Sequence, residues 1–329
     1  MTTDSSSKIT RPNTINYQGI LASLDQIDVW ISTFLFRLSL PPIVEAIYSV
    51  PANFFGLVPS LAICPLWIAV LALEDGVGVG ELPRGVQQQH SKIILLKSVT
   101  VLLTIVFLVA WALFQKGYNA AFKNLLVKKS YYLFSILFNV GLLSYTVLQL
   151  PSDDPYAASS KKAFSLATYL LFLWPPSLLL IIISKRWFQR VRPVVLDLTS
   201  GDSHHWLKNK TFPNISYYLA SKHQAKESFP SGDATSAAIF AIVLVNISPR
   251  YITAAWSILF LACTGRMYVL AHHFFDVLTG SMIAFAIYRF TTSIGLGIYD
   301  MQWWYPLAST MSLTVYVYKS RMENKQKLI

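Results

Sequence analysis

Hydrophobic residues in this chain are gathered into long runs separated by shorter polar segments. About half of the runs reach the roughly 20 residues that a helix needs to cross the hydrocarbon core of a bilayer. The pattern therefore predicts a bundle of apolar helices. The runs lie near residues 52–73, 93–115, 131–150, 164–184, 234–247, 251–264, 274–292 and, more weakly, 304–318.

Composition agrees with a membrane location. Of the 329 residues, 54% are hydrophobic and 13% are charged, whereas an ordinary soluble domain carries about 25% charged residues. The alternative is a large soluble helical core, but so many long uncharged runs are rare in soluble chains. We therefore expect an all-α, polytopic helical membrane protein. The net charge of +11 then reflects positive loops, and we expect no nucleic-acid partner.

The segment before the first apolar run has two parts. Residues 1–19 are polar and lack the apolar region of a cleaved signal peptide, so we expect a disordered tail. Residues 20–42 are predicted to form an amphipathic helix lying in the membrane surface. Its apolar face comprises Ile20, Leu24, Ile27, Ile31, Phe34 and Leu38, and its polar face comprises Asp25, Asp28 and Ser32.

The two cysteines, Cys64 and Cys263, lie in apolar runs far apart in the sequence. Buried free cysteine behaves as a small hydrophobic residue. We therefore expect both to be core residues, which leaves neither a disulfide framework nor a cysteine metal site.

Basic residues cluster directly after the run 164–184, in "SKRWFQRVRP". Lys185, Arg186, Arg190 and Arg192 occur there within eight residues. One interpretation is a basic stretch flanking a membrane span. The other is a phosphate cradle, in which arginine supplies a planar fork and lysine a point charge.

A second cluster lies in "TGRMYVLAHHFFD". Arg266 interrupts an apolar stretch, and an intramembrane arginine is costly enough to indicate a function. His272 and Asp276 stand four residues apart and would share one face of a helix, where the carboxylate can orient the imidazole and raise its basicity. The alternative is a structural His–Asp pair. His273 would point elsewhere, and we interpret it as interfacial.

Together these stretches resemble the type 2 phosphatidic acid phosphatase (PAP2) superfamily. Lys185, six residues and then Arg192-Pro193 match its first motif, and "PSG" at 230–232 matches the start of its second. Arg266, five residues, His272, three residues and Asp276 match the third, although Gly265 stands where the family usually has serine. The three motifs together are a specific signal, because each fragment alone arises by chance far more often.

The resemblance implies a domain organisation. A transmembrane domain would span residues 43–318, with the motif-bearing six-helix core at about 93–292. The runs 52–73 and 304–318 would be additions to that core. Residues 319–329 would form a basic polar tail.

The resemblance also implies roles for the matched residues. Lys185, Arg192 and Arg266 would bind the phosphoryl oxygens, aided by the backbone N–H groups of Ser231 and Gly232 where a helix begins. His272 would attack phosphorus and form a phosphohistidine, with Asp276 holding its other nitrogen. No metal or other cofactor is implied, because the cationic side chains supply the charge that Mg²⁺ supplies elsewhere.

Asp233 departs from the pattern, because the family normally has at this position a histidine that protonates the leaving alcohol. Three interpretations stay open. Asp233 is itself the general acid, or Ser231 or Asp233 caps the helix that begins here. In the third, the proton comes from the loop histidines His204, His205 or His223.

Three functions follow from these residues. The first is an integral membrane phosphatase that acts on a lipid phosphate or lipid diphosphate reached from the bilayer. The second is a lipid phosphotransferase, and the third is a catalytically silent relative that binds lipid or partners. Two glycosylation sequons, at Asn209 and Asn214, favour a luminal site in an endomembrane such as the endoplasmic reticulum. The positive-inside rule favours the cytosolic side.

Overall fold

The computed structural model describes residues 20–55, 57–76, 87–115, 141–143, 157–195, 227–298, 301–302 and 304–326. Every regular element in these residues is helical, which confirms the all-α prediction. The elements are α1 (Ile20–Arg37), α2 (Pro42–Phe54), α3 (Leu57–Ala62), α4 (Cys64–Gly76), α5 (Gln87–Gln115), α8 (Ala157–Phe188), α12 (Gly232–Ile247), the 3-10 turn η4 (Pro249–Tyr251), α13 (Ile252–Tyr268), α14 (Phe274–Ser293) and α15 (Trp304–Gln326).

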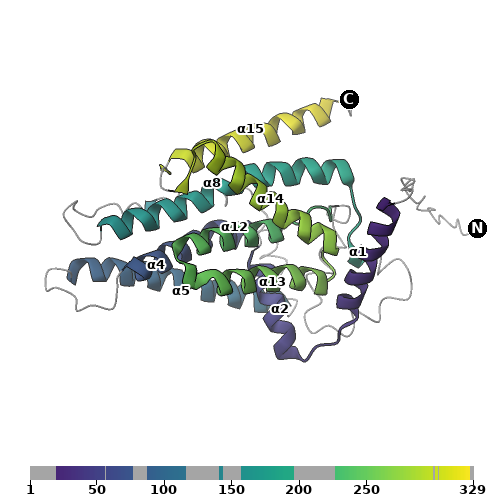
Figure 1. The fold of residues 1–329 in the computed structure, drawn as a ribbon, viewed down its shortest axis with the longest axis horizontal. Coiled ribbons are helices and arrows are strands. Elements are labelled where there is room, and N and C mark those ends of the chain that lie inside the picture. The colour runs from purple at the N-terminus through teal and green to yellow at the C-terminus, as the bar shows by residue number, and fades with distance from the viewer. Residues whose placement is uncertain are drawn as a thin grey trace, which may run out of the picture.

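Helix α12 forms the centre of the bundle and packs against α8, α13 and α14 (Figure 1). Most of its residues are buried, because nearly every side chain is apolar or small and a neighbour lies on each side. Helix α4 packs along α8, and α5 packs on α4. Helix α15 packs on α8, and a hydrogen bond of 2.8 Å joins the hydroxyls of Tyr169 in α8 and Thr291 in α14.

Three of the described helical segments are long and apolar enough to cross a membrane: Ser91–Ala110, Ala158–Val195 and Phe274–Ser293. Helix α12 is equally apolar in character but shorter. These helices confirm the prediction of a helical membrane protein. Of the apolar run 131–150, only residues 141–143 fall within the described part of the chain.

Two apolar runs differ from the expected single segments. The run 52–73 is divided among three helices: the end of α2, all of α3 and most of α4. The break between α2 and α3 lies near Phe55, and the break between α3 and α4 lies at Ile63. Pro65 is the second residue of α4. Proline lacks a backbone N–H, but an N–H in the first turn of a helix makes no hydrogen bond within the helix. Proline therefore favours a helix start at this position. At the other end, α15 continues from the run 304–318 to Gln326 and includes most of the expected polar tail.

Helix α1 forms as expected, but two residues of its predicted polar face, Asp28 and Ser32, do not point to water. Asp28 and Ser32 are 0% and 1% exposed, whereas Trp30 is 71% and Phe34 60% exposed. The helix lies across the end of the bundle where α13 ends and α14 begins (Figure 1). Asp28 and Ser32 therefore pack on the protein, whereas Ile27, Trp30 and Phe34 point outward.

Both cysteines are free, as expected from the sequence. Cys64 is buried in α4, and Cys263 is half-buried in α13 with its Sγ 3.6 Å from Ser281 Oγ.

Candidate active site

Four segments meet at one end of the bundle: the end of α8, residues 227–231, the end of α13 and the start of α14. They meet because α12 and α13 run antiparallel, so that α12 begins beside the end of α13. Backbone hydrogen bonds tie the segments together. The N–H of Ser228 donates to Arg190 O at 3.0 Å, Val194 N–H donates to Leu270 O at 3.0 Å, and Ser231 N–H donates to Asp276 O at 2.9 Å.

The turn before α12 is held tightly against α14. Ser231 is the N-cap of α12, and its Oγ accepts from the Ala234 N–H at 3.3 Å. Thr235 Oγ1 donates to Gly280 O at 2.7 Å, and a Cβ at Gly280 would collide with the carbonyl oxygen of Ser231. Only glycine allows α14 to approach the turn this closely.

This arrangement changes one expectation for the backbone. The N–H of Ser231 already donates to Asp276 O and is not free for a phosphoryl oxygen. Gly232 is the first residue of α12, where an N–H has no partner within the helix. Of the two expected backbone donors, Gly232 is therefore the one suited to bind an anion.

The side chain of His272 is buried and held in one tautomer. Its Nδ1 lies 2.7 Å from the carbonyl oxygen of Ser228, which can only accept a hydrogen bond, so Nδ1 carries the proton. The lone pair is therefore on Nε2, which accepts from Arg192 Nη1 at 3.3 Å. Burial, together with the positive charge of Arg192, lowers the pKa of His272 well below its ordinary value. The result is a neutral imidazole whose lone pair is on Nε2.

Asp276 supports this histidine largely through Ser228. Its Oδ2 accepts from the Ser228 Oγ and, at 2.8 Å, from the His273 N–H, while its Oδ1 accepts from Arg190 Nη1 at 2.8 Å. The distance from Asp276 Oδ2 to His272 Nδ1 is 3.7 Å. Asp276 thus fixes Ser228, and the Ser228 carbonyl fixes the imidazole.

Two sequence interpretations of this region were wrong. His272 lies in the turn before α14 and not on a helix, so it meets Asp276 because that turn folds back and not because of a shared helical face. His273 is not interfacial: it is 5% exposed, is the N-cap of α14, and donates from Nε2 to Val191 O at 3.3 Å.

Three cationic side chains converge beside His272. Lys185 Nζ donates to Glu227 O at 2.8 Å, and Arg192 Nη1 donates to Ala271 O at 2.8 Å. Arg266 is 5% exposed, and its Nε is buried without a hydrogen-bond partner. The charges of these three side chains act on one another and on Asp233. A buried, unsatisfied donor in such a cluster suits an anionic ligand.

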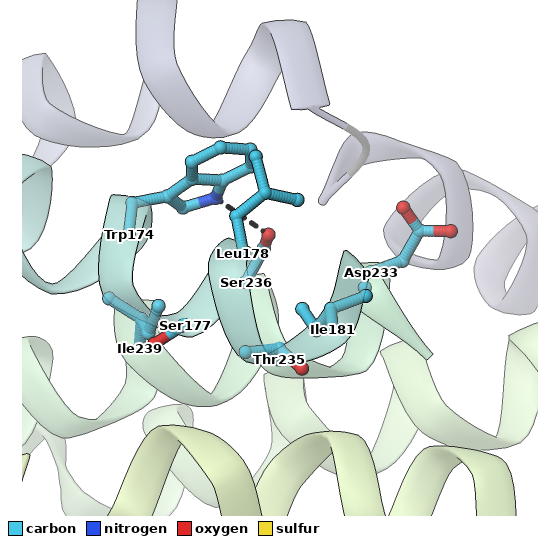
Figure 2. A pocket seen from close by; sticks show the side chains of 9 residues that line it. Trp174, Ser177, Leu178, Ile181, Asp233, Thr235, Ser236 and Ile239 are labelled. Atoms are coloured by element: carbon cyan, nitrogen blue, oxygen red, sulfur yellow. Dashed lines mark hydrogen bonds between the residues drawn. The ribbon is translucent and has the colours of Figure 1, made fainter. Parts of the chain in front are cut away.

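Asp233 forms an ion pair with one of these cations. Its Oδ2 lies 2.6 Å from Arg266 Nη2, and the two side chains are 21% and 6% exposed. Since Ser231 is the N-cap of α12, the carboxylate of Asp233 has this different role in the structure. It also lies at one end of a small, mainly apolar pocket between α8 and α12, with Trp174 and Ile239 toward the other end (Figure 2).

The glycine at position 265 has a packing reason. A Cβ there would collide with the carbonyl oxygen of Tyr48 and would lie 2.7 Å from the Cβ of Ala52, both in α2. Helix α2 therefore occupies the space that a serine side chain would need. The same helix brings Asn53 to the site, where its Oδ1 accepts from Arg266 Nη1 at 3.4 Å.

Sequence reasoning did not assign a role to several residues of this site: Asp28, Ser32, Asn53, Arg190 and Ser228. Asp28 and Ser32 were visible as a polar face, and Arg190 as part of a basic cluster. Ser228 and Asn53 carried no signal, because their contacts join segments far apart in the chain. The loop histidines at 204, 205 and 223 and the two sequons lie outside the described residues.

Among the described residues, no group of three or more His, Cys, Asp or Glu side chains is arranged to hold a metal ion. No curated protein and no solved structure matches the chain. One family model does match, and the matched residues contain the whole convergent set from Lys185 to Asp276 but neither α1 nor α2. Residues 162–297 match the model of the PAP2 superfamily, which indicates a phosphatase-type function.

Proposed function

We propose that the protein is an integral membrane phosphatase that hydrolyses a lipid phosphate or lipid diphosphate through a phosphohistidine on His272. The observation that carries this proposal is the orientation of His272. Its Nδ1 donates to Ser228 O, so the lone pair of Nε2 points to the side where Arg192 lies. A neutral imidazole held in this tautomer beside a cluster of cations is suited to attack a phosphoryl group.

In the first step, Nε2 of His272 attacks phosphorus, and the bond from phosphorus to the leaving oxygen breaks. Before this attack, as the phosphate binds, Arg192 turns from Nε2 to a phosphoryl oxygen and so frees the lone pair, and Lys185 and Arg266 bind the other oxygens. Once the phosphate has taken Arg266 from Asp233 and the released carboxyl has bound a proton, Asp233 gives that proton to the leaving oxygen. In the second step, a water oxygen attacks phosphorus, the bond to Nε2 breaks, and the water proton returns to Asp233.

Asp276 stabilises the phosphorylated ring without touching the phosphate. The ring becomes cationic when Nε2 binds phosphorus while Nδ1 keeps its proton. The carboxylate 3.7 Å from Nδ1 favours that positive charge. We expect no metal requirement, since three cationic side chains already face the position of the phosphate.

A lipid substrate fits the surroundings of Asp233. The pocket between α8 and α12 has a volume of about 100 Å³, and Leu178, Ile181 and Ile239 line it (Figure 2). An apolar pocket beside a polar centre suits the first carbon atoms of a hydrocarbon chain. The helices around it belong to the apolar bundle, so the chain could continue into the bilayer.

One observation favours the alternative of a silent, lipid-binding relative. The ion pair between Asp233 and Arg266 occupies a cation that the phosphate needs. A protein of this kind would bind the lipid phosphate without turnover.

The test is phosphate release from mixed micelles of detergent and a long-chain lipid phosphate or diphosphate, with purified wild type and His272→Ala. We expect turnover by the wild type, none by His272→Ala, and an acid-labile phosphoprotein trapped at short times in the wild type only. Binding without turnover by the wild type would favour the silent relative. Transfer to an added alcohol in place of water would indicate a phosphotransferase.

A further inference from the structure

Helix α1 supplies part of the site although it lies outside the residues that match the PAP2 model. Asp28 Oδ1 accepts from the Phe275 N–H at 2.9 Å, and Ser32 Oγ accepts from the Phe274 N–H at 3.0 Å. These are the first two N–H groups of α14, which have no partner within that helix. Side chains of α1 thus cap α14 from outside, at the turn that carries His272.

Asp28 also reaches the Asp276 carboxylate through Arg190. Arg190 Nη2 donates to Asp28 Oδ2, and its Nη1 donates to Asp276 Oδ1 at 2.8 Å. Both carboxylates are 0% exposed, and the Arg190 side chain is 23% exposed. Buried carboxylates are costly unless they are paired and hydrogen-bonded, so the three groups depend on one another.

The planar guanidinium fixes the geometry of the two carboxylates. Each of its two terminal nitrogens binds one carboxylate. Because the guanidinium is rigid and planar, it cannot turn to follow one carboxylate without also displacing the other. From Asp276 the contacts continue through the Ser228 Oγ and then from the Ser228 carbonyl to His272 Nδ1 at 2.7 Å. A continuous set of charged and polar contacts therefore joins α1 to the imidazole.

The charges of this set matter as well as its geometry. Asp276 must keep negative charge available to stabilise the positive ring of phosphorylated His272. The positive charge of Arg190 partly neutralises Asp276. The negative charge of Asp28 offsets part of the charge of Arg190, so Asp276 is neutralised less. The other charges acting on His272 are those of Arg192 and Arg266, both cationic, so the negative charge of Asp276 opposes them and Asp28 acts on His272 only by way of Arg190 and Asp276.

We propose that Asp28 is a positioning residue for the reaction: through Arg190 it fixes Asp276 and leaves the charge of Asp276 available to His272. This inference rests on the proposed phosphatase function. Asp28 does not touch the substrate, so its removal affects kcat and not KM.

The first test is Asp28→Asn, which keeps an oxygen for the Phe275 N–H but removes the charge. We expect kcat to fall roughly 10–100-fold, the range for the loss of a residue that orients a primary site residue, with KM unchanged. The acid limb of the pH–rate profile should move to lower pH, because Arg190, no longer neutralised by Asp28, leaves Asp276 less able to favour protonation of His272. A merely structural role would lower the active fraction and leave the profile in place.

The second test is a double-mutant cycle with Arg190→Gln. If Asp28 acts through Arg190, the double variant Asp28→Asn/Arg190→Gln loses no more kcat than Arg190→Gln alone. Losses in kcat that multiply in the double variant would overturn the inference. So would a wild-type kcat and pH profile in Asp28→Asn.

Two further variants on α1 separate charge from capping. Ser32→Ala removes the hydrogen bond to the Phe274 N–H, so we expect lower thermal stability with an unshifted pH profile. Gln26→Ala, at an exposed position of the same helix, is the control and should match the wild type in both thermal stability and pH profile.

If Asp28→Asn does not fold, Asp28→Glu takes its place. It keeps the charge, so the acid limb of its pH–rate profile should coincide with that of the wild type. A shifted limb in Asp28→Glu would contradict the charge argument.

Phosphate release by the wild type distinguishes a failure of the proposed phosphatase function from a failure of the inference about Asp28. No phosphate release by the folded wild-type protein would overturn the proposed function and the inference with it. Release by the wild type together with an unaffected Asp28→Asn would overturn the inference alone.

Discussion

Replacing Asp233 by asparagine separates its proposed role from its observed contact. In the proposed mechanism Asp233 protonates the leaving oxygen, and in the structure it pairs with Arg266, which the phosphate of the proposed substrate must reach. Asparagine keeps the shape but removes both the acid and the negative charge. The first role affects kcat, and the second affects KM.

The size of each effect follows from the contact. The pair has an N···O distance of 2.6 Å and side chains that are 6% and 21% exposed, so it is largely shielded from water. A hydrogen bond to a charged group contributes about 1.5–3 kcal/mol, and each 1.4 kcal/mol is a factor of about ten in an equilibrium constant. If the phosphate must displace Asp233, Asp233→Asn lowers KM by roughly 10–100-fold. Loss of a general acid lowers kcat by roughly 10²–10⁴-fold.

The assay is steady-state phosphate release from a lipid monophosphate and from the corresponding diphosphate. A diphosphate leaves as a better-stabilised anion and needs less protonation, so its kcat should fall much less in Asp233→Asn. The matched control is Asp75→Asn, which breaks a 3.0 Å pair with Arg250 at the opposite end of the bundle and should leave both constants unchanged. Equal losses of kcat on the two substrates would refute the acid role, and an unchanged KM would refute the competition with phosphate.

Three further predictions concern the metal, the pH profile and the glycine under α2. Phosphate release should continue in EDTA, and activity lost on chelation and restored by Mg²⁺ would contradict the mechanism. Burial lowers the pKa of His272, so its imidazole stays neutral near neutral pH. Turnover should therefore persist as the pH falls through about 6.5, the ordinary pKa of histidine. A loss of turnover on protonation near that pH would argue against His272 as the nucleophile. Gly265→Ser should destabilise the protein by about 1–3 kcal/mol through overpacking against α2, measured as a lower unfolding temperature in detergent, while Gly141→Ser, where a Cβ meets nothing within 4 Å, should be neutral.

The sequence alone determined the class of fold and predicted the residues of the candidate site. Long uncharged runs can only be satisfied by helices buried in protein or lipid, because each backbone polar group must be bonded internally. The spacings around Arg192, Arg266 and His272 identified the cations and the nucleophile candidate, since costly polar groups in apolar surroundings indicate a site. The family match over residues 162–297 agrees with that pattern.

Local geometry was predicted less well, because periodicity assumes a regular helix. The spacing of His272 and Asp276 was consistent with one helical face, yet a turn brings them together. The run 52–73 was consistent with one span, yet it is divided among three helices. Hydrophobicity indicates burial in each case but does not specify where a helix begins or ends.

Only the tertiary structure decided what surrounds the centre. Asp28 is separated from Arg190 by 162 positions, and Arg266 is separated from Asn53 by 213. Such contacts depend on how α1 and α2 dock, and that docking is a property of packing and not of local pattern. The tight approach of α2 explains why glycine stands at position 265, and the contacts with Arg190 and the Phe275 N–H explain how the carboxylate of Asp28 is buried. Side chains far apart in sequence meet there because each buried charge requires a partner, and only the folded chain supplies it.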